Sequence, residues 1–179
     1  MSEEIKEIIK GRLSKEGVII SDPHSIVELQ KRGYGELEGE KLVLRDYEAL
    51  YLLYTNRLKV LSDDKELNLD DLASFALKKD PQAWTRFLIY RNLRSRGYVA
   101  KEGFGFGVDF RLYDRGDFGS KPAKYVVFGL NEGTELPLSK LKSFIDQMNR
   151  MGKEAIIAVI ERRGEVIYYR VSRTKFKEL

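Results

Sequence analysis

A chain of 179 residues is long enough for one large domain or two small ones, and its 42% apolar and 34% charged residues are typical of a globular protein. The absence of cysteine excludes disulfides and thiolate metal sites. A net charge of +4 permits an anionic partner such as a nucleic acid, but the same density of mixed charge is common in proteins from hot environments.

Neither a membrane span nor a signal peptide is predicted. The longest purely apolar run, Ala155–Ile160, is far shorter than the roughly 20 residues that a spanning helix needs. The segment Met1–Ile5 is acidic and lacks the basic and then apolar pattern of a signal peptide. We therefore expect a cytoplasmic protein without membrane contact, and no motif indicates a metal or another cofactor.

Periodicity and turn residues predict the elements of the first part of the chain. Alternation from Ile5 to Ile20, interrupted by Gly11 and Gly17, predicts two short strands, and Ser21-Asp-Pro23 is a common helix start. The further predicted elements are a hairpin over 35–44 with its turn near Gly39, a helix capped by Asp46, a strand at 58–61 and a helix capped by Asn68.

Charge and a proline gather at Lys78-Lys-Asp-Pro81, which makes this segment the best domain boundary. We therefore expect an N-terminal domain over 1–80 and a C-terminal domain over 81–179. The predicted elements of the second are a helix at 82–96, strands at 98–102, 108–113 and 124–130, a helix at 138–151 and a hairpin of strands 155–161 and 165–171. The fold class is mixed α/β (α+β): a small α/β domain, then a domain with a mixed central sheet and flanking helices.

Two patterns in the second half have both a nucleic-acid reading and a simpler one. The glycines of Gly103–Gly107 lack the spacing of a phosphate loop, and no helix start follows them, so a turn is the better interpretation. Phe104, Phe106, Phe110 and Tyr113 could stack on unpaired bases, but aromatics at alternating positions more often fill a core. Tyr113 is the exception, because it ends a strand and the turn that follows could expose its hydroxyl. Arginines on the helix at 82–96 could face RNA or could be its solvated side.

Four segments together resemble the nuclease domain of archaeal tRNA-splicing endonucleases: Arg94–Tyr98, Gly107–Tyr113, Tyr125-Val-Val, and Lys153 before an apolar strand. The resemblance covers about residues 84–171, and residues 1–80 are compatible with the family's smaller N-terminal domain. It implies metal-independent cleavage of precursor tRNA at exon–intron junctions. In that reaction a ribose 2′-hydroxyl attacks the neighbouring phosphate and leaves a 2′,3′-cyclic phosphate and a 5′-hydroxyl.

In this family a tyrosine and a histidine transfer the protons, and a lysine stabilises the charge that builds on the phosphate. The resemblance places the tyrosine at Tyr113 and the lysine at Lys153, but the histidine position is Pro122, which cannot titrate. Neighbouring Lys121 would be a poor acid at an ordinary pKa of about 10.4. The single histidine of the chain, His24, lies in the N-terminal region.

Two further positions depart from the family pattern. An arginine that holds an extruded base usually stands seven residues before the catalytic lysine, and here that residue is Asp146. A hairpin that is often acidic in the family, where it docks on a partner subunit, has mixed charge here at Glu161–Glu165.

We therefore predict a non-catalytic, structural subunit of a heteromeric tRNA-splicing endonuclease. The resemblance implies pairing with a homologous catalytic subunit through edge strands near Val166–Val171, a heterotetramer, and contact with precursor tRNA, for which Arg91, Arg94 and Lys124 are candidates. Two alternatives stay open. One is an RNA-binding module without an endonuclease partner, and the other is a self-sufficient nuclease that uses Tyr113 and Lys153 with Lys121 or a water as the acid.

Overall fold

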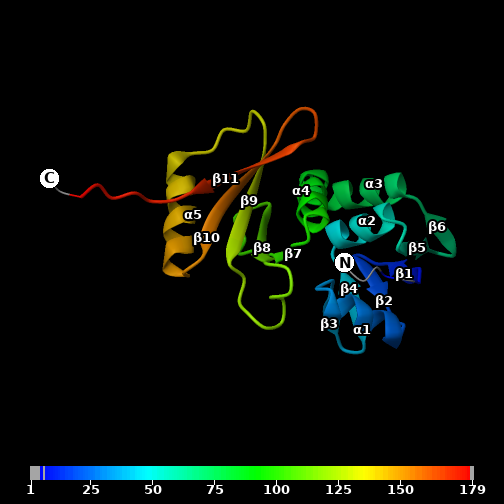
Figure 1. Cartoon of the computed structure of the whole chain (residues 1–179). Helices are drawn as coiled ribbons and strands as arrows, with labels where there is room; N and C mark the ends of the chain where they lie inside the picture. The colour runs from blue at the N-terminus through cyan, green and yellow to red at the C-terminus, as the bar shows by residue number, and fades with distance from the viewer. Residues whose placement is uncertain (1–4, 6, 178–179) are drawn as a thin grey trace. The chain divides into compact units, whose positions relative to one another are not determined.

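The computed structural model describes residues 5 and 7–177, which form two compact units (Figure 1). The first unit ends at Arg91 and the second begins at Asn92, so their border lies within helix α4 (Ala83–Ser95). The domain boundary predicted from the sequence lies before this helix, after residue 80, and it stays a prediction. The mixed α/β fold class is confirmed, because each unit combines a mixed sheet with helices.

The first unit is built on a six-stranded sheet in the order β3-β4-β2-β1-β5-β6. β1 and β5 run parallel, and every other neighbouring pair is antiparallel. Its elements are β1 (Ile9–Leu13), β2 (Val18–Ile20), α1 (Pro23–Lys31), β3 (Glu36–Glu38), β4 (Lys41–Leu44), α2 (Asp46–Tyr54), β5 (Leu58–Ser62), β6 (Lys65–Leu67) and α3 (Leu69–Lys79).

Short polar contacts set the helix starts of the first unit. The Asp22 carboxylate accepts hydrogen bonds from the amide and the hydroxyl of Ser25, at 2.8 and 2.7 Å, which confirms the predicted start of α1. The predicted cap of α2 is wrong: Asp46 is its first helical residue and Arg45 occupies the cap position. The carboxylate of Glu48 reaches back to the Arg45 amide at 2.8 Å and so satisfies a donor at the helix start.

The core of the first unit combines one face of the sheet with aromatic rings from two helices. Strand residues alternate between buried and exposed along β1, and Ile9 and Gly11 are buried while Lys10 between them is exposed. The ring of Tyr90, from α4, lies 4.8 Å from the ring of Tyr47 in α2. Figure 1 shows α2 and α3 next to each other in this unit.

The second unit has a five-stranded sheet in the order β11-β10-β9-β8-β7, in which only β9 and β10 run parallel among the paired strands. Phe144 and Met148 of α5 pack on Val126, Phe128 and Ala155 of the central strands. The elements of this unit after α4 are β7 (Val99–Glu102), β8 (Asp109–Tyr113), β9 (Tyr125–Asn131), α5 (Leu138–Arg150), β10 (Glu154–Ile160) and β11 (Val166–Val171). Figure 1 shows α5 alongside the sheet, with the segment after β11 leading away from it.

No helix in the described part of the chain combines the length and the apolarity that crossing a membrane requires.

Candidate functional site

Tyr113, Lys124 and Lys153 lie at the same end of three neighbouring strands in the second unit. Tyr113 ends β8, Lys124 precedes β9 and Lys153 precedes β10. The amide of Lys124 donates to the carbonyl of Leu112, and the amide of Glu154 donates to the carbonyl of Lys124, both at 3.0 Å. Leu112 and Glu154 both pair with Tyr125, the first residue of β9. One residue further along each strand, Tyr113, Lys124 and Lys153 therefore lie in one row across the sheet.

The side chain of Tyr113 is half-buried against the loop that follows β8. Its ring meets the ring of Phe118 edge to face, with the centroids 5.2 Å apart. Phe118 belongs to the connection of residues 114–124, which leads to β9 and contains the position of the family histidine. The conformation of this connection therefore decides what surrounds the tyrosine.

The ammonium group of Lys153 is held by the same connection. Its Nζ donates a hydrogen bond of 2.6 Å to the carbonyl oxygen of Ala123, which directly follows Pro122. Lys153 is half-buried, and its own amide donates to the carbonyl of Met148 at 2.9 Å, at the end of α5. A lysine ammonium has three donors, so this contact leaves two for another acceptor.

Pro122, at the position predicted for the family histidine, has no side chain that could deliver a proton. Pro122 is exposed, and the exposed Lys121 beside it forms an ion pair of 2.8 Å with Asp117. The hydrogen bond to Asp117 and the charge of that carboxylate raise the pKa of Lys121, which makes this lysine a weaker acid than an isolated one. His24 lies in α1 of the first unit.

Asp146, at the position predicted for a family arginine, lies on α5. It pairs with Lys142 one turn earlier, Nζ to Oδ2 at 2.6 Å. The hydrogen bond from Lys142 lowers the pKa of Asp146, so the aspartate stays charged.

The three candidate RNA contacts have different surroundings. The Arg91 guanidinium lies over two rings of the first unit, 5.2 Å from the centroid of Tyr54 and 5.7 Å from that of Phe87. Arg94 is half-buried on the same helix, whereas Lys124 is exposed at the end of the sheet. The hydrogen bond with the neighbouring Tyr125 raises the pKa of Lys124, so its cation is retained at neutral pH. A role of these residues in RNA binding stays a prediction.

Comparison with known proteins assigns both units to one family. The model of the tRNA intron endonuclease catalytic C-terminal domain matches residues 83–168, and that of the N-terminal domain of the same enzymes matches residues 9–73. The chain belongs to the tRNA intron endonuclease family. The expected family resemblance is thereby confirmed, over both parts of the chain.

Relatives from archaea match this chain over nearly its whole length. The tRNA-splicing endonuclease of Pyrococcus furiosus is 34% identical over 96% of this chain and 100% of the relative. That of Methanococcus vannielii is 33% identical over 95% of this chain and 97% of the relative, and that of Methanothermobacter thermautotrophicus is 30% identical over 91% and 96%. All the residues of the candidate site lie within the match to the catalytic C-terminal domain.

Proposed function

We propose that this chain is a catalytically incomplete, structural subunit of a heteromeric tRNA-splicing endonuclease. Such an enzyme cuts precursor tRNA at exon–intron junctions and leaves 2′,3′-cyclic phosphate and 5′-hydroxyl ends. The chain would act in the cytoplasm beside a homologous subunit that carries the histidine. The observation on which the proposal rests is the exposed proline, Pro122, at the position of the proton donor.

The missing acid is the decisive defect because the leaving ribose oxygen needs a proton. General acid catalysis contributes about 10²- to 10⁴-fold to a rate, so a site without it is slow even when the other groups are in place. Tyr113 and Lys153 share a row of the sheet, but Lys121 is bound to Asp117. The carboxylate of Asp146 adds a second defect, since it stands where a base-holding arginine is expected.

The partner surface that we propose is the outer edge of β11. Within the described residues this strand pairs only with β10 and ends the sheet, so its outer backbone groups can accept a strand from another subunit. Ile167 and Tyr169 alternate along β11 and are 36% and 53% exposed. Apolar side chains beside an open edge favour a subunit interface in which strands of two homologous chains run side by side.

Cleavage assays with and without a catalytic homologue test the proposal. The purified chain, a histidine-bearing homologue and their mixture are each incubated with an intron-containing precursor tRNA, and the termini of the products are analysed. We expect no cleavage by the chain alone and cleavage by the mixture that depends on the homologue's histidine. The Tyr113→Phe variant of this chain should support the same rate in the mixture as the unchanged chain.

Two results would contradict the proposal. Cleavage by the chain alone with a cyclic phosphate product, slowed about 10²-fold or more by Tyr113→Phe, would identify a self-sufficient nuclease. Failure to form a complex with any histidine-bearing homologue, together with binding of precursor tRNA, would favour an RNA-binding module.

A further inference from the structure

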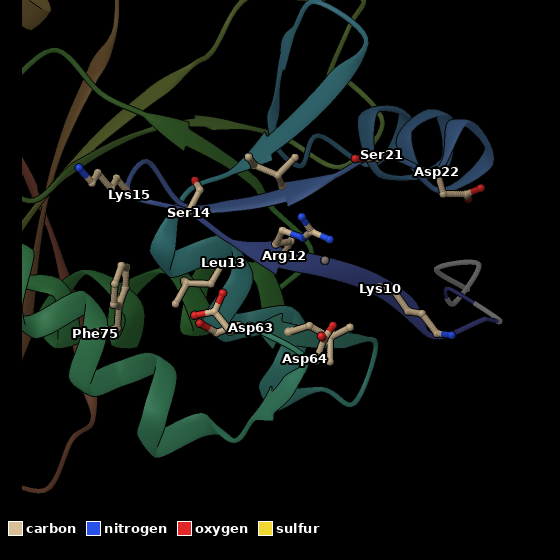
Figure 2. A pocket seen from close by; sticks show the side chains of 14 residues that line it. Lys10, Arg12, Leu13, Ser14, Lys15, Ser21, Asp22, Asp63, Asp64 and Phe75 are labelled. Atoms are coloured by element: carbon tan, nitrogen blue, oxygen red, sulfur yellow. The ribbon is translucent and has the colours of Figure 1, made fainter.

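A hollow of about 620 Å³ lies on the sheet of the first unit (Figure 2), whereas Tyr113 and Lys153 belong to the second unit. Its centre is β1, and the ends of β2 and β5 form its two sides. Ile19 and Leu61 lie on the two strands that flank Arg12, and the register places both directly beside it. The hollow therefore combines apolar walls with a central cation.

Three cations line this hollow. Lys10 and Arg12 occupy alternate, exposed positions of β1, and the exposed Lys15 follows the strand. Figure 2 shows Arg12 in the middle, with Lys10 and Lys15 toward the two ends. Among residues 5 and 7–177, none of these three side chains forms an ion pair or a hydrogen bond, so their donors are available to a bound molecule.

Lys10 has a cation as its neighbour on the next strand. Lys10 lies directly beside Lys59 in the parallel pair of β1 and β5, and like charges on neighbouring strands repel each other. The charge of Lys59 is balanced by an ion pair of 3.6 Å with Glu66, whereas Lys10 forms no ion pair within the described residues. A bound phosphate near Lys10 and Arg12 would remove this repulsion.

Within the described residues, the carboxylates that line the hollow form no ion pairs with its three cations. Asp22 accepts two hydrogen bonds from Ser25 and is occupied as the cap of α1. Asp63 and Asp64 form the turn after β5 in the left-handed conformation, with φ of 46° and 63°. Although both line the hollow, neither forms an ion pair with Arg12 in the part of the chain that the structure describes. The hollow is thus lined by three cations and three carboxylates, with Arg12 on its central strand and carboxylates after β2 and after β5 on its two sides.

We propose that this hollow binds a single-stranded segment of RNA, with a phosphate on Arg12 between Lys10 and Lys15. Arginine holds a phosphate through two parallel hydrogen bonds, and the apolar walls at Ile19 and Leu61 provide contact area for an unstacked base or its ribose. A concave site of this size suits an unpaired nucleotide better than a duplex, whose bases are stacked inside the helix. The inference rests on the proposed function only in that the ligand is RNA, and it needs no catalysis.

Fluorescence anisotropy with the full chain tests the site. The probes are a short dye-labelled single-stranded RNA of mixed sequence and the same RNA as a duplex. Arg12→Ala should weaken binding of the single strand about tenfold or more, because it removes both charge-assisted hydrogen bonds to the phosphate, and Arg12→Lys should weaken it less. The slope of log affinity against log salt should fall by about 0.7 for each phosphate that the variant no longer neutralises.

Lys31→Ala is the matched control, because it removes an exposed cation of α1 that does not line the hollow. It should change the affinity less than about twofold. Equal losses of affinity with Arg12→Ala and Lys31→Ala would overturn the inference, since the effect would then be a general one of net charge. An Arg12→Ala variant with unchanged RNA binding but without binding to a catalytic homologue would also overturn it, in favour of a protein ligand.

The failure of this inference is distinguishable from failure of the proposed function. Cleavage of RNA by the chain alone would end the structural-subunit proposal but would leave the comparison of Arg12→Ala with Lys31→Ala intact. Unchanged RNA affinity of Arg12→Ala would end the present inference and would say nothing against a complex with a catalytic homologue.

Discussion

The ammonium group of Lys153 donates a hydrogen bond to the carbonyl oxygen of Ala123, 30 residues earlier in the chain, at 2.6 Å. This contact fastens the connection between β8 and β9 to the start of β10. A lysine that would stabilise charge in an active nuclease thus has a structural partner here.

Replacing Lys153 by methionine should therefore destabilise the fold while leaving the activity of the complex unchanged. We expect the free energy of unfolding in urea to fall by about 1 kcal/mol, the usual net contribution of one hydrogen bond from a partly screened charge. Lys142→Met is the control, because its exposed pair with Asp146 one turn away should contribute less than about 0.5 kcal/mol. A loss of cleavage by the assembled complex with Lys153→Met would contradict the structural role.

Restoring the acid should create activity in this chain. Pro122→His puts a side chain with a pKa near 6.5 at the family's histidine position, next to the row of Tyr113 and Lys153. We expect this variant to cleave precursor tRNA and to leave a cyclic phosphate, at a rate about 10²- to 10⁴-fold above the unchanged chain. Adding Tyr113→Phe should remove the gain. A Pro122→His chain that folds normally and stays inactive would show that more than the acid is missing.

The edge of β11 should tolerate a charge in the isolated chain but not in a complex. Tyr169→Glu changes a side chain that is 53% exposed, so the free energy of unfolding should change by less than about 0.5 kcal/mol. The variant should no longer form a complex with a catalytic homologue, as measured by size-exclusion chromatography. Ser74→Glu, at an exposed position of α3, is the control and should leave the complex intact. A complex that survives Tyr169→Glu would place the interface elsewhere.

Tyr168 should make stability depend on alkaline pH. Its hydroxyl forms a hydrogen bond of 2.8 Å with the Asn92 side chain, and burial raises its pKa well above the ordinary 10.0. Above about pH 10 the unfolded chain loses this proton while the folded chain keeps it, so the folded state becomes less stable as the pH rises.

The comparison with Tyr168→Phe isolates this effect, because the other tyrosines are common to both proteins. At pH 7 the variant should be about 1 kcal/mol less stable, since it lacks the hydrogen bond to Asn92. Between about pH 10 and pH 11, where an ordinary tyrosine titrates, the difference should shrink, as measured by urea unfolding at each pH. A constant difference over this range would mean that Tyr168 titrates alike in both states.

Glu48 should be one of the most sensitive positions of the first unit. This carboxylate is 1% exposed and accepts from the amides of Gly35 and Arg45, at 3.0 and 2.8 Å. Glu48→Ala removes both hydrogen bonds and should lower the free energy of unfolding by about 2–4 kcal/mol, with Glu48→Gln in between. Glu38→Ala, on the exposed edge strand β3, should cost less than about 0.5 kcal/mol in the same urea measurement.

Helices and strands with clear periodicity or clear capping residues are predictable from the sequence, and elements without such a pattern are not. The alternation in this part of the chain predicts a strand at 165–171, and the structure has one that begins a residue later, at Val166–Val171. β6 has no such signal, because Lys65-Glu-Leu67 contains a single apolar residue. It pairs with β5 through a tight turn in which Asp63 and Asp64 adopt the left-handed conformation. The predicted cap of α2 is off by one residue because Glu48, not Asp46, satisfies the first amide.

The candidate site is predictable only as a set of family positions. The resemblance selects Tyr113 and Lys153, but the contact between Lys153 and Ala123 depends on how three strands align and has no local signal. The stacking of Arg91 on Tyr54 likewise joins different helices, whereas the sequence indicates only a charged helix face at Arg91. The alternation at Lys10 and Arg12 predicts the polar positions of a strand, and nothing in the sequence marks a hollow there.

Among the residues that the structure describes, no strand pairs with the outer edge of β11, and this affects how much of the protein a cell can accumulate. A strand with open backbone groups and apolar neighbours such as Ile167 and Tyr169 will pair with its own kind when nothing else covers it. Copies made in excess of their cover would associate with one another or be degraded. With the interface proposed above, production of this chain would have to keep pace with that of the protein that covers the strand.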